Sequence, residues 1–481
     1  MGLRMVLVAA TVVGLAACSG DETGGGGQGA GGTTTSTSSS SGMGGGGTGG
    51  SGGVGGQPSG EIVYAITAGH AIYQDTPTAV AAHGDGRTVV VGDVNTLQSG
   101  DFTRPWVRYL DDHGTESWLW ELTVTHNSGA RDVAVHTDGS VAVTGVFIDS
   151  IDFGSGPVSG MFSREVFVMK LSAAGDVLWA EAIVDDYSLL GWGVSFDHDG
   201  DVLFSATLSG EVTIAGLVFD ATPGGMAVAK LDGATGAGQW ATVIGEQVGS
   251  SLLHNVACDS AGNVVVTGSL TGTSPLGGGL TTAGQADVLV AKLSPDGAPL
   301  WAAHYGDDVR QDANAVAIGP DDSITVGGDF AGTLDFGGDP LTSAGARDAF
   351  LVRFDSDGNH LWSARFGDDQ DQTLLGLDVD ATGAVVATGG FFGAFDLGGD
   401  TLMGNPPDVL SSSWMAKLDP DGAHLWSYGG TSTGGFSLGR DVAMDGASNV
   451  YVLGLVGGEM NIGDTSLTST TNDVYLLKLT P

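Results

Sequence analysis

Short apolar runs separated by tight polar turns repeat along most of the chain. In one representative stretch, apolar runs at 316–318, 324–328 and 349–354 are followed by a fourth run that contains Trp362. Asp-Asp or Asp-Gly turns separate the first run from the second and the third from the fourth. Such runs are typical of β-strands, and no segment shows the 3.6-residue period of an amphipathic helix. The pattern predicts an all-β protein built from four-stranded antiparallel units.

The four-run unit recurs at a nearly constant interval. Each fourth run has a tryptophan four residues after a glycine, in the pairs Gly114/Trp118, Gly175/Trp179, Gly236/Trp240, Gly297/Trp301, Gly358/Trp362 and Gly422/Trp426. Successive tryptophans lie 61 residues apart, except for a last step of 64. The first run of each unit has an apolar anchor, at Val80, Val133, Val194, Val256, Val316, Leu377 and Val442. A period of this length indicates a repeat architecture, here with seven units.

The two ends of the repeat region complement each other. The last unit stops at Leu479, after its third run. The first unit is preceded by a spare run, 62–66, that has Tyr64 in the tryptophan position. Four antiparallel strands form one blade of a β-propeller, and pairing the spare strand with the last unit would leave no open edge. We therefore predict a seven-bladed β-propeller of four-stranded antiparallel blades over residues 61–481, closed by the N-terminal strand.

The first 60 residues differ in composition from the repeats. Residues 1–17 carry one basic residue, Arg4, and then an apolar run too short to span a bilayer, which is typical of a signal peptide. The sequence LAAC that ends at Cys18 resembles the bacterial lipobox, in which the cysteine becomes the lipidated first residue. Residues 18–60 are otherwise almost wholly Gly, Ser and Thr, which indicates a flexible tether.

These features predict a lipid-anchored protein of the bacterial cell envelope. An ordinary secretory signal, cleaved near the same position, is the alternative. Ser19 follows the cysteine, where well-studied Gram-negative lipoproteins retained in the inner membrane have aspartate. The resemblance therefore implies the outer membrane, with the propeller either periplasmic or exposed at the surface.

The charge balance excludes one class of partner. The chain has 56 acidic and 16 basic residues, a formal net charge of -40. Such a surface repels phosphate backbones, so we expect no nucleic-acid binding. It suits solubility, divalent cations or basic partners, and we expect a monomer. Of the two cysteines, Cys258 lies in an apolar run and is expected to be an inert buried thiol.

Two stretches resemble known propeller repeats. The sequences DVLVAKLSPDGAPLWAAHYGDD at 287–308 and DAFLVRFDSDGNHLWSARFGDD at 348–369 resemble the bacterial SBBP repeat, which is common in surface and secreted proteins. This resemblance covers 61–481 and implies a fold but no activity. Asp232–Gly236 with Trp240 is similar to the tryptophan-docking motif of quinoprotein-type propellers, which include an outer-membrane assembly lipoprotein. The vicinal cysteines of quinone-dependent dehydrogenases are absent, so no quinone cofactor is implied.

Residues that recur in every unit are interpreted as structural. The tryptophans are expected to pack between blades. A basic residue just before each acidic turn is expected to form a structural ion pair or to bury its stem. These basic residues are Arg108, Lys170, Lys230, Lys292, Arg353, Lys417 and Lys478.

Other local motifs give no cofactor and no catalytic residue. The Asp-x-Asp-Gly turns supply two carboxylates, whereas calcium needs about 6–8 oxygen ligands. We therefore expect no cofactor and leave calcium open as the one alternative. Gly435–Gly439 matches G-x-S-x-G by letter but lacks the strand-to-helix turn of a nucleophile elbow, so no catalytic residue is predicted.

Selective binding is expected where the units differ. The Asp-Gly turns lie on one face and are nearly uniform. The connections from the second run to the third, and from the fourth run to the next unit, lie on the opposite face and vary in length and charge. These connections carry Asp307, Asp308, Asp368 and Asp369. Because variable loops on a rigid scaffold usually carry function, these residues are the candidate binding site for a protein or glycan ligand.

The predicted function is therefore an envelope-anchored binding or scaffold module, not an enzyme. One alternative is a carbohydrate-active hydrolase or lyase with carboxylates in the central pocket, for which paired acids about 5–9 Å apart are expected. The other is a scaffold in outer-membrane protein assembly, which rests on the resemblance at Asp232–Gly236 alone.

Overall fold

The computed structural model describes residues 60–68, 73–96, 102–184, 189–246, 252–282, 284–405 and 411–481. The signal peptide, Cys18 and the tether as far as residue 59 lie outside these ranges. The described residues form β-strands and one 3-10 turn, Leu276–Gly278, so the predicted all-β class is confirmed. Within these ranges, no helix has the length and apolarity needed to cross a membrane.

Five of the sheets consist of consecutive antiparallel strands. The first contains β2 (Tyr73–Ala82), β3 (Thr88–Thr96), β4 (Arg104–Leu110) and β5 (Glu116–Glu121). The second contains β7 (Gly129–Val135), β8 (Val141–Asp152), β9 (Pro157–Leu171) and β10 (Val177–Ile183), with β6 (Thr123–Val124) paired to β8. The third contains β11 (Leu190–Phe196), β12 (Val202–Ile214), β13 (Leu217–Leu231) and β14 (Gly238–Glu246).

The fourth and fifth sheets have the same plan with short hairpins added. The fourth contains β15 (Leu252–Cys258), β16 (Val264–Leu270), β19 (Asp287–Leu293) and β20 (Pro299–Tyr305). The fifth contains β21 (Gln311–Ile318), β22 (Ile324–Phe330), β25 (Asp348–Phe354) and β26 (His360–Phe366). The hairpins pair β17 (Thr273–Ser274) with β18 (Leu280–Thr281), β23 (Thr333–Leu334) with β24 (Leu341–Thr342), and β29 (Ala394–Phe395) with β30 (Leu402–Met403).

The remaining sheet has seven strands, so the prediction of separate four-stranded sheets throughout is wrong. From one edge, its strands are β27 (Gln372–Val379), β28 (Val385–Phe391), β31 (Ser412–Leu418), β32 (His424–Met444), β33 (Val450–Ile462) and β34 (Thr465–Leu479). The N-terminal strand β1 (Ile62–Ala68) forms the other edge and pairs with β34. β32 pairs with β31 as far as Gly430 and with β33 from Thr431 onward. The sequence predicts a loop between the run that contains Trp426 and the first run of the next unit. This segment is instead part of the continuous strand β32, because β33 of the β33–β34 hairpin supplies backbone partners for it.

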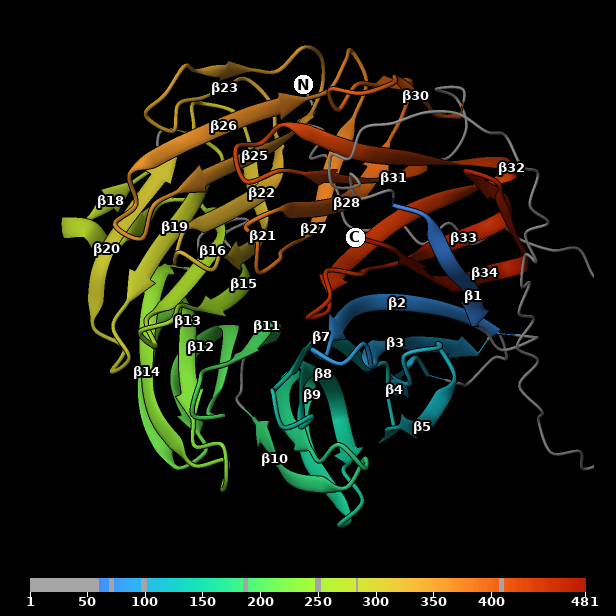
Figure 1. Ribbon diagram of the computed structural model, residues 1–481. Helices are drawn as coiled ribbons and strands as arrows, with labels where there is room; N and C mark the ends of the chain where they lie inside the picture. Colours follow the sequence, from blue (N-terminus) through green and yellow to red (C-terminus); the bar gives the residue numbers. More distant parts are fainter. Residues whose placement is uncertain are drawn as a thin grey trace, which may run out of the picture. The chain divides into compact units, whose positions relative to one another are not determined.

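The innermost strands form a closed ring. Each contacts the next in the order β2, β7, β11, β15, β21, β27 and β32, and β32 contacts β2. Figure 1 shows β7, β11, β15, β21 and β27 around the centre, whereas β5, β10, β14, β20 and β26 lie outermost. This arrangement is a β-propeller. An innermost strand with the strands that lie outward of it is called a blade below.

The N-terminal strand lies beside the last strand of the chain, as the sequence predicts. β1 pairs with β34 in antiparallel register from Ile62 opposite Leu479 to Ala68 opposite Val474. Residues more than 400 positions apart in sequence therefore share one blade. The pairing covers the edge that β34 would otherwise expose.

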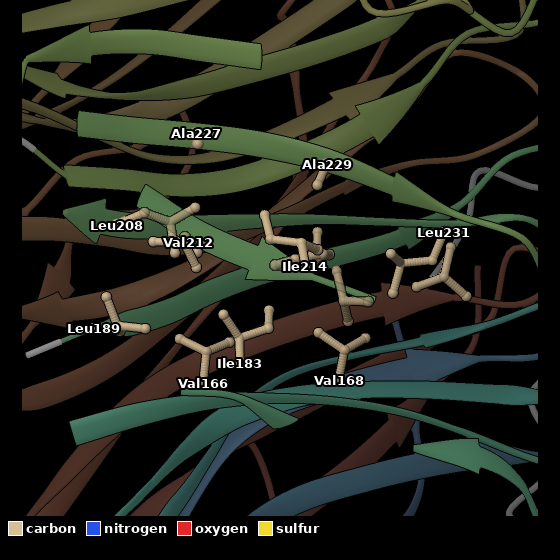
Figure 2. Packing of buried hydrophobic residues seen from close by; sticks show 14 of the residues in the cluster. Val166, Val168, Ile183, Leu189, Leu208, Val212, Ile214, Ala227, Ala229 and Leu231 are labelled. Atoms are coloured by element: carbon tan, nitrogen blue, oxygen red, sulfur yellow. The ribbon is translucent and has the colours of Figure 1, made fainter. Parts of the chain in front are cut away.

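The apolar core lies between successive sheets. Figure 2 shows one such layer, in which Val166 and Val168 of β9 and Ile183 of β10 lie against Val212 and Ile214 of β12. All five are almost wholly buried. Each such side chain contributes roughly 1.5–3 kcal/mol on burial, so every pair of neighbouring blades is held by its own apolar layer.

Candidate functional site

The tryptophans of the outer strands join neighbouring blades, as predicted. Five indole N–H groups donate to a backbone carbonyl in a turn of the next blade: Trp118 to Ala173 (3.2 Å), Trp179 to Gly233 (3.1 Å), Trp240 to Pro295 (2.8 Å), Trp301 to Ser356 (3.4 Å) and Trp362 to Pro420 (2.9 Å). Each ring lies against the glycine of that turn. The fixed Gly-to-Trp spacing is therefore a requirement of blade packing.

The same contact closes the ring at the chain's ends. Gly60, just before β1, lies against Trp426, and a Cβ added there would be 2.9 Å from the indole ring. Tyr64 of β1 lies in turn against Gly114 of the first blade. The N-terminal segment thus supplies both the glycine and the aromatic residue that the closing blade needs.

The seven repeated cations are buried and structural, as predicted. Ion pairs join Lys230 to Asp197 (2.6 Å), Lys292 to Asp259 (2.8 Å), Lys417 to Asp380 (3.2 Å), Arg353 to Asp321 (3.3 Å) and Arg108 to Glu116 (3.4 Å). Lys170 and Lys478 instead donate to backbone carbonyls and lie over the rings of Phe196 and Tyr451.

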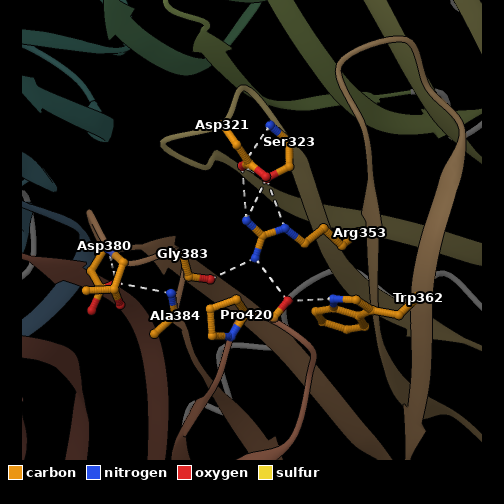
Figure 3. Close-up of polar contacts among 9 residues, drawn as sticks. Asp321, Ser323, Arg353, Trp362, Asp380, Gly383, Ala384 and Pro420 are labelled. Carbon is orange, nitrogen blue, oxygen red and sulfur yellow. Dashed lines mark hydrogen bonds and ion pairs between the residues drawn. The ribbon is translucent and has the colours of Figure 1, made fainter.

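Arg353 shows how these cations also connect blades. Figure 3 shows its guanidinium reaching from β25 to Asp321 and Ser323 of its own blade and to the carbonyls of Gly383 and Pro420 in the next. Because the guanidinium satisfies acceptors on both sides, the buried charge stabilises the junction.

The acidic turns close on themselves. Asp355 Oδ1 accepts hydrogen bonds from the amides of Asp357 (2.9 Å) and Asn359 (2.8 Å). Asp197 and Asp419 make equivalent contacts. A carboxylate used in this way defines the turn, and nothing in its geometry calls for calcium.

Ser437 lies inside β32 and is buried, so the G-x-S-x-G match is not a nucleophile elbow. Its hydroxyl donates to the carbonyl of Gly430 (2.7 Å) and accepts from the amide of Ser413 (2.9 Å). Cys258 is half-buried, and burial raises the pKa of its thiol to about 12, in line with an inert thiol.

The four candidate aspartates divide into two kinds. Asp307 accepts from the amides of Val309 (3.1 Å) and Thr333 (2.7 Å), which fastens the β23–β24 hairpin to the connection before β21. Asp368 holds the next blade's hairpin in the same way, through the amide of Ala394 (3.0 Å). Asp308 and Asp369 follow them in sequence and are exposed. The structure therefore leaves the two exposed residues as the more suitable ligand contacts.

A ring of unlike residues lines a pocket of about 170 Å³ at the centre of the propeller. Seven of the residues lining it stand two positions before the anchors: Thr78, Arg131, Trp192, His254, Asn314, Leu375 and Arg440. The anchors themselves line an adjoining pocket of about 320 Å³. Each repeat places one residue at this position, two before its anchor. If these residues served the same packing role in every repeat, they would be expected to resemble one another. The ring instead combines two cations with aromatic, polar and apolar side chains.

Several donors in this pocket have no partner in the described parts of the chain. The indole Nε1 of Trp192 and Nε2 of His254 are buried without a hydrogen bond, and their rings lie 5.6 Å apart. Arg131 and Arg440 are half-buried, and neither makes an ion pair or hydrogen bond to these residues. Burial and then the charge of Arg131 lower the pKa of Arg440. Both arginines line this pocket, and their charges are close enough to interact.

The pocket's carboxylates are used in blade packing. Asp132 accepts from the amides of Val133 (2.8 Å) and of Val194 in the next blade (2.7 Å). Asp441 accepts from the amides of Val442 (2.9 Å) and of Val80 in the next blade (2.8 Å). Burial raises the pKa of Asp132 to about 7 and that of Asp441 to about 8. Burial also raises the pKa of Asp93 to about 7, although the charges of Arg131 and Arg440 oppose this shift.

Sequence reasoning missed this ring. The available signal was the tetrapeptide Arg-Asp-Val-Ala, which occurs at 131–134 and again at 440–443. Aligning the units on their anchors would have shown that both arginines occupy one structural level. The charge pattern drew attention instead to the loops at the same end of these strands, outside the ring.

The fold places the chain among β-propeller proteins. No family model matches the chain. A WD repeat-containing protein of Acanthamoeba polyphaga mimivirus, L264, is 24% identical in an alignment of 195 residues that covers 35% of this chain and 14% of that protein.

Solved propeller structures are similar at low identity. They include the Pan2 WD40 domain of Neurospora crassa (9% identical, TM-score 0.43, 84% of this chain and 89% of that one). BamB of Moraxella catarrhalis is 14% identical with a TM-score of 0.38, covering 86% of this chain and 91% of that one. The quinohemoprotein alcohol dehydrogenase of Comamonas testosteroni is 10% identical, with a TM-score of 0.38 and coverage of 84% and 75%. Likeness at this level gives no basis for transferring a function.

Proposed function

We propose that this chain is a lipid-anchored envelope protein whose seven-bladed propeller binds a ligand through its central pocket. The observation that carries the proposal is the ring of unlike residues at the level two positions before the anchors. At this level the repeats diverge in chemistry, and the ring donors of Trp192 and His254 are buried without a partner in the described residues.

The blade number follows from treating the seven-stranded sheet as two blades. β32 contributes its first part to the blade of β27 and its second part to the blade of β33, β34 and β1. The closed contact ring of innermost strands supports this reading. So do the Gly60–Trp426 and Gly114–Tyr64 contacts, which repeat the packing found between the other blades.

The pocket and the variable loops are accessible from the same end. Innermost strands run from the variable connections toward the Asp-Gly turns, and the ring residues precede the anchors. The ring therefore lies toward the variable-loop end of each strand, where exposed Asp308 and Asp369 are also found. We infer that a protein or glycan ligand contacts these loops while one of its groups enters the pocket.

No observation favours the hydrolase or the assembly scaffold. The carboxylates in the pocket accept backbone amides at blade junctions, which is a structural use. The envelope assignment rests on the lipobox-like sequence at Cys18 and the tether, with the outer membrane implied by Ser19.

Capture from detergent-solubilised envelopes tests the function. Wild-type protein is compared with Leu375→Trp, which fills the pocket, and with Val218→Trp, which adds the same side chain at an exposed site on β13. We expect wild type and Val218→Trp to retain the same ligand and Leu375→Trp to lose it. Equal retention by all three would show that binding does not use the pocket.

The anchor is tested separately. Cys18→Ala is expected to move the protein from the membrane fraction to the soluble fraction with an unchanged melting temperature. A variant that still sediments with membranes would contradict lipidation at Cys18.

A further inference from the structure

We infer that the central pocket binds an oxyanion, a carboxylate or phosphate-type group of the ligand, between Arg131 and Arg440. This inference rests on the proposed function and specifies the chemistry that its pocket recognises. The arginines belong to the second blade and to the blade of β33, β34 and β1, which flank the first blade on either side. The first blade contributes only Thr78 and Ala79 to the lining of this pocket.

Two arginines lining one pocket are costly without a shared acceptor. A guanidinium presents five N–H donors in a planar fork and stays charged at every physiological pH. Placing two such groups close together out of bulk water is unfavourable unless hydrogen-bonding anions satisfy them. In the described parts of the chain, no carboxylate lies within ion-pairing distance of either arginine.

In the described residues no nearby acid forms an ion pair with either arginine, although the charges of both arginines lower the pKa of Asp93. Asp132 and Asp441 each use both oxygens to accept backbone amides at a blade junction. Asp93 accepts from the amide of Ala130 at 2.9 Å. All three also have raised pKa values because of burial, which reduces their negative charge near neutral pH.

The remaining lining adds neutral donors and no competing acid. Trp192 offers an indole N–H, which can donate only. Burial lowers the pKa of His254 to about 4, so the ring is neutral and can donate from one nitrogen. Asn314 also lines the pocket, but its amide nitrogen already donates to Asp329 (2.9 Å) and to the carbonyl of Leu374 (2.8 Å). The pocket of about 170 Å³ has room for an oxyanion and bound water.

This arrangement also fits a very acidic chain. Of 16 basic residues in the chain, seven are the repeated structural cations, and two of the remaining nine converge on one pocket. The surrounding negative surface repels anions in general. A ligand with one anionic group and a larger neutral or basic part would therefore be selected over free polyanions.

The test measures anion binding to the full-length protein in detergent by isothermal titration calorimetry. Phosphate, sulfate and malonate are titrated at constant ionic strength set with chloride. Arg131→Gln and Arg440→Gln each replace one guanidinium group with a neutral amide. Arg87→Gln is the matched control, because it removes an arginine that pairs with exposed Asp85 on the other face.

We expect wild type and Arg87→Gln to bind at least one of the three anions with similar affinity. Each pocket variant should bind about tenfold or more weakly, since hydrogen bonds to a charged group are lost. Arg440→Lys should give intermediate affinity, because it keeps the charge but loses the fork. Preference for phosphate or for malonate identifies the type of anionic group.

Two results would overturn the inference. One is that wild type binds none of the three anions beyond chloride. The other is that Arg131→Gln and Arg440→Gln bind as well as wild type while circular dichroism shows them folded. If a neutral ligand is then captured by wild type and not by Leu375→Trp, the oxyanion inference fails while the pocket-binding function stands.

Discussion

At the scale of single residues, buried charge holds this propeller together. Lys417 and Asp380 both have side chains only 2% exposed, and their atoms lie 3.2 Å apart. Oδ1 of Asp380 also accepts hydrogen bonds from backbone amides of its own turn, and Lys417 pairs with the other carboxylate oxygen. The equivalent position in every blade carries a cation, which explains why basic residues are retained in a chain with so few of them.

Lys417→Met should lower the free energy of unfolding by about 3 kcal/mol or more, because a buried carboxylate would lose its cation. Arg87→Gln breaks an exposed pair and should cost about 0–1 kcal/mol. Urea unfolding of the two variants gives the comparison. Equal losses would show that the buried cation does not stabilise the blade.

The packing of a tryptophan ring on a turn glycine can be tested by comparing Gly→Ala variants. One variant replaces a glycine that contacts a ring, and the other replaces a glycine with a similar φ and no such contact. Gly297 has φ +79° and a Cβ there would lie 2.6 Å from the ring of Trp240, whereas Gly216 has φ +85° and open space around it. Replacing either by alanine costs about 1–2 kcal/mol of left-handed strain. We expect Gly297→Ala to cost at least about 1 kcal/mol more, from the contact with the ring. Equal unfolding free energies would mean that the ring moves aside freely.

At the scale of elements, the sequence predicted strands and turns well because each unit repeats the same local chemistry. The left-handed turn position holds glycine in five units, and Asp322 (φ 60°) and Ser448 (φ 61°) adopt the same conformation in the other two. Asp322 compensates by accepting from the amide of Ser260 in the preceding blade at 2.8 Å. The continuous strand β32 could not be predicted in this way, since its middle residues pair with the far end of β33, in the next blade.

Closure by β1 is the element-level prediction. Deleting 60–68 would remove the pairing with β34 and the glycine under Trp426. We expect the exposed β34 edge to cause self-association, and the melting temperature to fall. Size-exclusion chromatography with light scattering and thermal denaturation provide the readout. A monomeric variant with unchanged melting would contradict closure.

At the scale of the whole molecule, buried carboxylates should make stability fall as pH rises. Burial raises the pKa of Asp132 to about 7 and of Asp441 to about 8, from an ordinary value near 3.8 in the unfolded chain. Between about pH 4 and pH 8 the folded state therefore binds more protons than the unfolded state. The free energy of unfolding decreases with pH over that window. Below about pH 4, loss of turn carboxylates with lowered pKa values, such as Asp138 at about 2, reverses the trend.

Urea unfolding between pH 5 and pH 8 at fixed ionic strength tests this slope. Asp132→Asn should flatten it, because the titrating group is gone while one acceptor oxygen remains. Asp321→Asn is the control, since its lowered pKa places its titration below the window. Stability that rises from pH 5 to pH 8, or an unchanged slope in Asp132→Asn, would contradict the assignment.

The central pocket is the part of the molecule that could not be predicted from the sequence. Loops, turns and repeats are local, so their positions could be predicted from residue patterns. The pocket is assembled from one residue of each blade, and residues such as Arg131 and Arg440 are 309 positions apart in the chain. Nothing local marks them as neighbours until the ring is closed.

Native mass spectrometry of protein released from its own envelopes tests the central claim most directly. Wild-type protein and Val218→Trp should each carry an additional bound small-molecule mass, and Leu375→Trp should not. The same bound mass on Leu375→Trp, or none on wild type, would contradict a ligand site in the central pocket.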